Sequence, residues 1–185
     1  YVASRGADAV VRFDATTGAF VDTFASTGFS LPNTPEFGPD GNLYVTSRNT
    51  GEVVRFAPNG TLLGSFATTA QLGSPEGLTF AADGGLFVSG RSSSVVEHFD
   101  AAGTFVETVI ATPDVDAPEG LHFTADGSLW VASRDTQEVL QLEGGTWTEL
   151  ASFPFVVGEP IGLDVAPNGD VVVGLRGPGT LVTVQ

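Results

Sequence analysis

The chain has 185 residues, of which 42% are hydrophobic, and a formal net charge of −15 at pH 7. This apolar content argues against disorder, and no apolar run approaches the roughly 20 residues that cross a bilayer. The chain has seven cationic side chains, all of them arginines, so it lacks the basic surface that neutralises nucleic-acid phosphates or anionic lipids. We therefore expect neither nucleic-acid binding nor membrane insertion. Cysteine is absent, which excludes disulfides and thiolate chemistry.

Five of the seven arginines recur at one position of a repeated unit. Each closes a short apolar run, as in Tyr-Val-Ala-Ser-Arg at the start of the chain. The spacings between successive members are 43, 43, 43 and 42 residues, and the members are Arg5, Arg48, Arg91, Arg134 and Arg176. A period of this size indicates an array of supersecondary units.

The expected elements are short strands separated by turns. The chain enters at a strand over residues 1–3, and a variant Pro-Asn-Thr opening follows at residue 32. The third unit shows the whole pattern. A Pro-Glu-Gly turn at residue 75 is followed by strands over residues 78–80, 86–88, 95–99 and 105–109. The fourth unit repeats this order from residue 118, and the last unit stops after a strand over 180–184. Four antiparallel strands per unit are typical of a β-propeller blade.

We therefore predict an all-β fold, a single β-propeller domain over residues 1–185. Its blade units are about 1–31, 32–74, 75–117, 118–159 and 160–185. By alignment on the arginines, three blades are complete, the first lacks its innermost strand and the last lacks its outermost strand. Open strand edges recruit further chain. We expect part of a six-bladed ring, incomplete at both ends, that further chain or a protein partner completes.

The unit P-x-G-L-x-F-x-x-D-G-x-L-x-V-x-S-R, followed by V-x-x-F-D and a glycine-containing turn, resembles the NHL-type propeller repeat. It is also similar to the streptogramin-lyase-like and gluconolactonase-like propellers, and the resemblance covers essentially the whole chain. It implies the fold more specifically than the function, because such folds host lyases, lactonases and adhesive modules. It also implies, loosely, an extracellular, periplasmic or cell-envelope location in bacteria.

The mouth of the central channel is the first candidate site. There the loop that enters each innermost strand and the loop after each second strand open on one face, so the arginines should meet the residues before the repeat's glycine. Those residues are Asn33, Glu76, Glu119 and Ile161. The resemblance implies that Asn33, Glu76 and Glu119 bind a metal such as Ca²⁺, a cation that accepts oxygen ligands. Ile161 breaks that pattern.

A structural role for the same residues is the alternative. Arginine offers five donors in a planar fork, so it can join the carboxylate of one blade to the next. The arginine occurs in every unit, whereas a catalytic site usually needs one special blade, and this regularity favours the structural role. A cationic ring that captures an anionic ligand remains a further alternative, although the net charge of −15 weakens it.

A second ring is expected along the channel. One position of the innermost strands holds four different polar residues, Glu36, Thr79, His122 and Asp164. His122 with Asp164 or Glu36 could act as a general base and its orienting group. The alternative is that a wet channel wall tolerates any polar side chain.

Two functions follow from these observations. The first is a non-enzymatic extracellular or envelope scaffold that binds proteins or ligands, which the near-uniform units favour. The second is a metal-assisted, lactonase- or lyase-like enzyme with Ca²⁺ at the channel mouth and His122 or Asp164 as its acid or base.

Overall fold

The computed structural model describes residues 1–152, 158–166, 169–177 and 179–184. In this part the chain forms five antiparallel sheets, three with four strands and two with three. The three-stranded sheets are the first, β1 Val2–Ser4, β2 Ala9–Phe13 and β3 Phe20–Ala25, and the fifth, β16 Glu159–Val165, β17 Val171–Arg176 and β18 Thr180–Val184. A 3₁₀ turn, η1 Arg5–Ala7, follows β1.

The three middle sheets each have four strands in simple meander order. The second contains β4 Pro32–Phe37, β5 Leu43–Ser47, β6 Glu52–Phe56 and β7 Leu62–Thr68. The third contains β8 Pro75–Phe80, β9 Leu86–Gly90, β10 Val95–Phe99 and β11 Phe105–Ala111. The fourth contains β12 Pro118–Phe123, β13 Leu129–Ser133, β14 Glu138–Glu143 and β15 Thr146–Ser152. The prediction of β-propeller blades with four antiparallel strands is confirmed.

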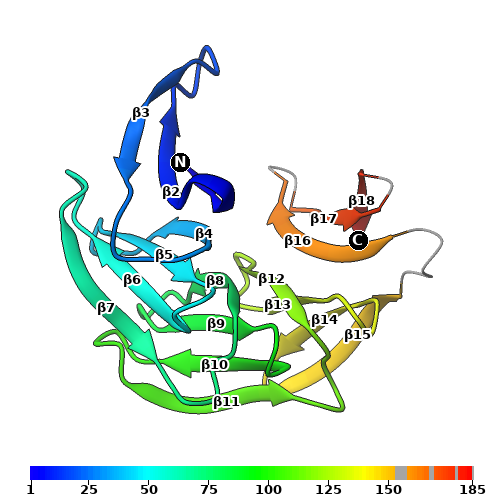
Figure 1. Cartoon of the computed structure of the whole chain (residues 1–185). Helices are drawn as coiled ribbons and strands as arrows, with labels where there is room; N and C mark the ends of the chain where they lie inside the picture. The colour runs from blue at the N-terminus through cyan, green and yellow to red at the C-terminus, as the bar shows by residue number, and fades with distance from the viewer. Residues whose placement is uncertain (153–157, 167–168, 178, 185) are drawn as a thin grey trace.

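The described chain therefore shows five blades rather than the six expected for a ring. They follow one another along an arc, and the blade of β2 and β3 stands apart from the blade of β16, β17 and β18 at its two ends (Figure 1). The innermost strands β4, β8, β12 and β16 line the inside of the arc in this view. None of the described residues forms a helix with the length and apolar character needed to span a bilayer.

The cores lie between neighbouring blades, where the faces of two sheets pack together. Tyr44 of the second blade, for example, joins Leu78, Leu86 and Phe99 of the third in one buried cluster. Trp130 of the fourth blade is buried with Val171 and Val173 of the next blade. Each blade thus buries apolar side chains on both faces only when it has a neighbour on both sides.

The Pro-Glu-Gly segment differs from the turn that we predicted. In the third blade Pro75 begins β8 and pairs with Gly90, whereas Leu78 pairs with Val88, so Glu76 and Gly77 form a bulge in the strand. An extra residue in a bulge leaves the ladder and re-aims its side chain. The bulge thereby turns Glu76 out of the strand's regular alternation.

One buried residue contradicts the packing pattern of the repeat. Glu97 of β10 is 0% exposed, although the same place holds Val54 in the second blade and Leu140 in the fourth. Its Oε2 accepts a hydrogen bond of 2.7 Å from the Thr69 hydroxyl, and its Oε1 has no hydrogen-bond partner among the residues that the structure describes. Burial raises the pKa of the Glu97 carboxyl, although the Thr69 hydrogen bond opposes this.

We expect Glu97→Val to raise the free energy of unfolding at pH 7 by about 1–2 kcal/mol, because it removes a buried, half-satisfied carboxyl group. The raised pKa means that the folded state binds the proton more tightly. Glu97 therefore favours folding most below its ordinary pKa, and this contribution is lost as the pH rises through the raised value. Urea unfolding from pH 4 to pH 8 should show a flatter profile for the variant. A lower stability of Glu97→Val at pH 8 would contradict this prediction.

Candidate functional site

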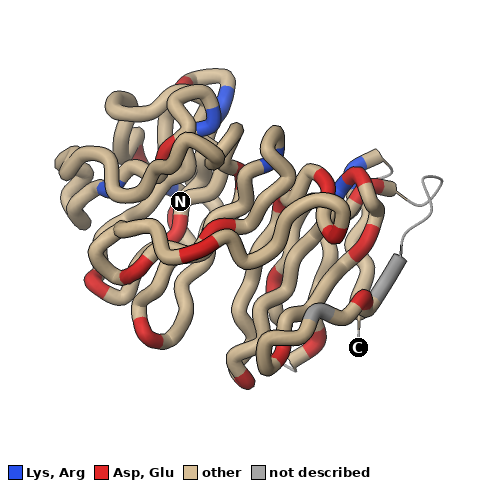
Figure 2. Tube along the Cα trace, turned by 90° about the horizontal axis from the view of Figure 1, so that it is seen from below, with Lys and Arg blue, Asp and Glu red and all other residues tan. Residues whose placement is uncertain are grey.

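The repeated arginines and the acidic residues of the innermost strands meet on one face of the arc, as expected. Acidic segments are spread over the whole molecule, whereas the basic segments are few and lie in the upper half of the view in Figure 2. Each repeated arginine directly follows a second strand or ends it, so regular strand geometry brings all five to equivalent places. We call this set of five arginines, together with Asn33, Glu76, Glu119 and Glu159, the mouth ring.

Glu76 is the centre of the mouth ring. It is 1% exposed, yet three arginines reach its carboxylate. Arg5 Nη2 lies 2.6 Å from Oε2, Arg48 Nε lies 3.2 Å from Oε1, and Arg91 Nη1 lies 4.0 Å from Oε1. Burial raises the pKa of Glu76, and the positive charges of Arg5 and Arg48 counteract that effect. One carboxylate thus connects the first, second and third blades.

Asn33 accounts for the contact between Arg5 of the first blade and Glu76 of the third blade. The second blade carries Asn33 where the third blade carries Glu76. Arg5 Nε donates to Asn33 Oδ1 at 3.1 Å, and Asn33 Nδ2 donates to the Glu76 backbone carbonyl at 3.0 Å. The neutral amide of Asn33 does not neutralise the charge of Arg5. Arg5 Nη2 donates both to Asn33 Oδ1, at 2.5 Å, and to Glu76 Oε2, at 2.6 Å.

The same scheme continues toward the end of the chain. Arg91 Nε lies 3.1 Å and Arg134 Nη1 lies 3.3 Å from Glu119 Oε1. Arg134 Nε also lies 2.7 Å from Asp135 Oδ1 and 3.8 Å from Glu159 Oε2. Arg176 forms an ion pair with Glu159. Arg48, Arg91 and Arg134 therefore each reach an acid of the following blade.

Glu159 is the residue that sequence reasoning missed. Alignment on the glycine placed Ile161 in the ring, but the carboxylate that meets Arg134 and Arg176 comes from Glu159, two residues earlier. In the fifth blade Pro160 pairs with Leu175 and Gly162 pairs with Gly174, so the irregularity in the strand lies at Ile161. The one-residue shorter spacing before Arg176 is the signal in the sequence that this unit has a different register.

Hydroxyl groups in the second strands form another link that the sequence did not reveal. Thr46 Oγ1 accepts a hydrogen bond of 2.9 Å from the Thr34 amide of its own blade and donates one of 2.8 Å to the Glu76 carbonyl of the next. Ser89 does the same with the Gly77 amide and the Glu119 carbonyl, at 2.8 Å each. The fourth blade has Ala132 at this place, so the pattern is not regular enough to stand out in the sequence.

The geometry of the mouth ring does not favour the binding of a metal ion. A dication at Asn33, Glu76 and Glu119 would face Arg5, Arg48, Arg91 and Arg134, which already occupy these oxygens. Among the described residues, no three acidic or histidine side chains are arranged to hold a metal ion. The arrangement can instead fix the blades relative to one another through charge-assisted hydrogen bonds.

The four residues of the expected channel ring have different environments. Thr79 is buried, Glu36 and His122 are half-buried, and Asp164 is exposed. Burial raises the pKa of Glu36 to about 7, while its carboxylate accepts a hydrogen bond from the Phe80 amide of the next blade. Asp164 Oδ1 accepts a hydrogen bond of 2.8 Å from the adjacent Val165 amide. In the described part of the chain, no hydrogen bond or ion pair joins His122 to Asp164.

The fold is shared with several solved structures. The chain superimposes on a catalytically inactive virginiamycin B lyase from Staphylococcus aureus, determined with quinupristin, with a TM-score of 0.73 and 14% identity, covering 97% of this chain and 63% of that one. A nidogen/laminin complex gives a TM-score of 0.81 at 18% identity, with coverages of 96% and 70%. A gluconolactonase from Xanthomonas campestris gives 0.78 at 18% identity, with coverages of 97% and 69%.

The chain has the propeller fold of these three proteins. This confirms the expected resemblance to the lyase, gluconolactonase and NHL-type propellers at the level of the fold. No protein-family model matches the sequence, and no curated protein matches it. The chain spans about 63% of the length of the virginiamycin B lyases that it matches.

Proposed function

We propose that this protein is a non-enzymatic β-propeller scaffold that binds proteins or ligands. The observation that carries the proposal is the mouth ring, in which the buried carboxylate of Glu76 contacts three arginines and Glu119 contacts two. Residues used in this way hold blades in place and are not free to bind a metal or to transfer protons. The nidogen/laminin complex shows that a protein of this fold is found in a protein assembly.

Two further parts of the proposal concern location and closure. We propose an extracellular or cell-envelope location, in which a net charge of −15 keeps a β-rich surface soluble. We also propose that further chain or a protein partner completes the propeller at the open ends of the arc. The exposed apolar faces at the two ends of the arc support closure by further strands.

Calorimetric titration with Ca²⁺ and with Mg²⁺ tests the non-enzymatic proposal. We expect neither ion to bind more tightly than about 1 mM, the weak end of calcium affinity in extracellular modules. Glu119→Gln serves as the control, because it removes a carboxylate that a metal would need. Binding well below 1 mM that is lost in Glu119→Gln would overturn the proposal and favour the Ca²⁺-assisted lactonase- or lyase-like enzyme.

A further inference from the structure

A hollow between the fourth and fifth blades lies at the end of the blades away from the mouth ring. Asp126, in the turn before β13, borders the hollow, whereas Arg134 of the mouth ring follows the other end of β13. Trp130 and Gln141 of the fourth blade and Val165 of the fifth also line it. Its volume of about 300 Å³ is at the lower end for ligand sites in proteins, so it suits a small molecule.

The hollow exists because the repeat changes in its last unit. In the three middle blades the innermost strand ends on an aromatic residue, and these residues are Phe37, Phe80 and Phe123. Each packs edge-to-face against an aromatic residue of the preceding blade, with ring centroids 4.9, 4.9 and 5.0 Å apart. Val165 holds this place in the fifth blade and packs against the cluster of Trp130. Because valine is smaller than phenylalanine, space beside Trp130 stays open.

Trp130 brings a buried hydrogen-bond donor to this hollow. The residue is 8% exposed, and its Nε1 has no hydrogen-bond partner among the residues that the structure describes. At the same place in the second blade, the Tyr44 hydroxyl donates to Asp40 Oδ2 at 3.0 Å. A buried donor without an acceptor costs free energy, so an acceptor on a bound molecule would stabilise the site.

Gln141 lies beside Trp130 on the same face of the fourth sheet, because the two residues pair directly across β13 and β14. In the third blade this place holds His98, whose ring stacks on Phe87 with centroids 4.3 Å apart. In the second blade it holds Arg55. The fourth blade thus replaces a cationic or titratable side chain with a neutral amide that both donates and accepts hydrogen bonds.

Asp126 supplies an acceptor at the rim of the hollow. Its Oδ1 accepts hydrogen bonds from the Thr124 hydroxyl at 2.6 Å and from the Ser128 amide at 3.0 Å. The Thr124 hydrogen bond, followed by that of the Ser128 amide, lowers the pKa of the Asp126 carboxyl. The side chain is therefore ionised at neutral pH and can accept a further hydrogen bond.

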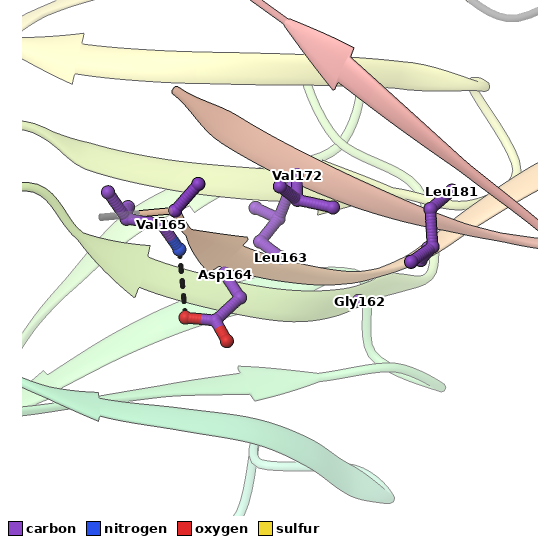
Figure 3. A pocket seen from close by; sticks show the side chains of 8 residues that line it. Gly162, Leu163, Asp164, Val165, Val172 and Leu181 are labelled. Atoms are coloured by element: carbon purple, nitrogen blue, oxygen red, sulfur yellow. Dashed lines mark hydrogen bonds between the residues drawn. The ribbon is translucent and has the colours of Figure 1, made fainter. Parts of the chain in front are cut away.

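The larger hollow on the uncovered face of the fifth blade has a different chemistry. It measures about 450 Å³, and Val172 and Leu181 contribute to its apolar lining (Figure 3). Leu181 is 73% exposed. Asp164 is the polar side chain of this lining; it is exposed and accepts a hydrogen bond from the adjacent Val165 amide. The hollow beside Trp130 instead combines apolar surface with a buried donor.

We propose that the hollow lined by Trp130, Gln141, Asp126 and Val165 binds a neutral sugar. A sugar hydroxyl accepts a hydrogen bond from Trp130 Nε1 and another donates to Asp126, because hydroxyl groups do both. An ammonium group cannot accept from the indole. A carboxylate or phosphate would face Asp126, and no arginine is among the described residues that line the hollow.

This inference gives a site and a ligand class to the ligand-binding part of the proposed function, on which it rests. The hollow lies apart from the mouth ring, so its test is independent of the calorimetric titration with metal ions. Failure of sugar binding would leave the non-enzymatic proposal standing. Tight Ca²⁺ binding would overturn that proposal without removing the sugar site.

The indole N–H signal of Trp130 tests the site in the parent chain. The chain has two tryptophans, so a proton–nitrogen correlation spectrum shows two indole signals, and Trp147→Phe identifies that of Trp130. Glucose, galactose and N-acetylglucosamine are the probes. We expect at least one of them to shift the Trp130 signal with a dissociation constant of roughly 1 mM, as for a ligand of about twelve heavy atoms. No shift with any of the three at about 50 mM, far above that constant, would overturn the proposal.

Val165→Phe tests the location of the sugar. It introduces the residue that Phe123 provides one blade earlier and fills the hollow without changing a polar group, so we expect binding to weaken at least about tenfold. Gln141→Leu should weaken binding by up to about tenfold, the effect of one lost hydrogen bond. Glu149→Gln is the control, because Glu149 is exposed and pairs with Leu140 rather than with Gln141. Unchanged affinity in Val165→Phe would show that the sugar binds elsewhere and would overturn the proposal.

Discussion

Gly77→Ala is expected to lower the free energy of unfolding by about 3 kcal/mol, the upper range for a methyl group forced into a packed site. The Cβ atom would lie 2.1 Å from the Glu119 carbonyl oxygen and 3.2 Å from Ser89 Oγ. The backbone of the next blade cannot yield without moving the strand, and the hydrogen bond from Ser89 to the Glu119 carbonyl would break. Thermal unfolding should show a Tm lower by roughly 6–12 °C for a chain of this size.

Gly162→Ala is the matched control for this prediction. It is the same substitution at the same place in the fifth blade. There, among the described residues, no atom outside Gly162 and its two chain neighbours lies within 4 Å of the new Cβ, and no positive φ hinders alanine. We expect it to be neutral or slightly stabilising, because alanine lowers the entropy of the unfolded chain. An equal loss of unfolding free energy in both variants would contradict this prediction. It would mean that glycine is needed at this place for its backbone conformation and not because the next blade lies so close.

Glu76→Gln is expected to lower the free energy of unfolding by about 2 kcal/mol. Removing one partner of a buried ion pair leaves the other charges uncompensated. The side chain of Glu76 is 1% exposed, but those of Arg5, Arg48 and Arg91 are 43%, 25% and 23% exposed, so water screens part of the loss. Denaturant unfolding at pH 7 measures the change, and the variant should bind Ca²⁺ no differently from the parent.

Glu159→Gln is the control at the exposed end of the mouth ring. Glu159 is 29% exposed and its partner Arg176 is 53% exposed, so we expect a loss below about 1 kcal/mol, as for other surface ion pairs. Addition of 0.5 M salt should reduce the difference for Glu159→Gln more than for Glu76→Gln, because buried charges are screened less. A larger loss for Glu159→Gln would show that the centre of the ring is not at Glu76.

The mouth ring accounts for the regularity of the arginines. A residue that recurs in every unit performs the same task in every unit, and here the task of Arg48, Arg91 and Arg134 is to contact an acid of the following blade. The variation lies among the acids. Asn33 replaces the acid in the second blade and Glu159 supplies it from a shifted place in the fifth. At these irregular positions the contacts between blades depart from the scheme of the repeat.

The sequence by itself determined the unit and much of its strand pattern. The arginine period, the alternation of apolar residues and the Asp-Gly turns predict antiparallel hairpins from local chemistry, and Gly84 does adopt a φ of 90° in one such turn. The meeting of Arg5, Arg48 and Arg91 with Glu76 could also be expected, because equivalent loops of a propeller open on one face.

Only the tertiary structure decided how the blades approach one another. The bulge at Glu76 and Gly77, the hydroxyl links of Thr46 and Ser89 and the substitute role of Glu159 depend on the distance between neighbouring innermost strands. The uncovered face around Leu181 depends on the number of blades present in the arc. A repeat fixes what each blade contains through contacts within one unit. Contacts between units require residues far apart in the chain to be placed in space, and no local pattern records those distances.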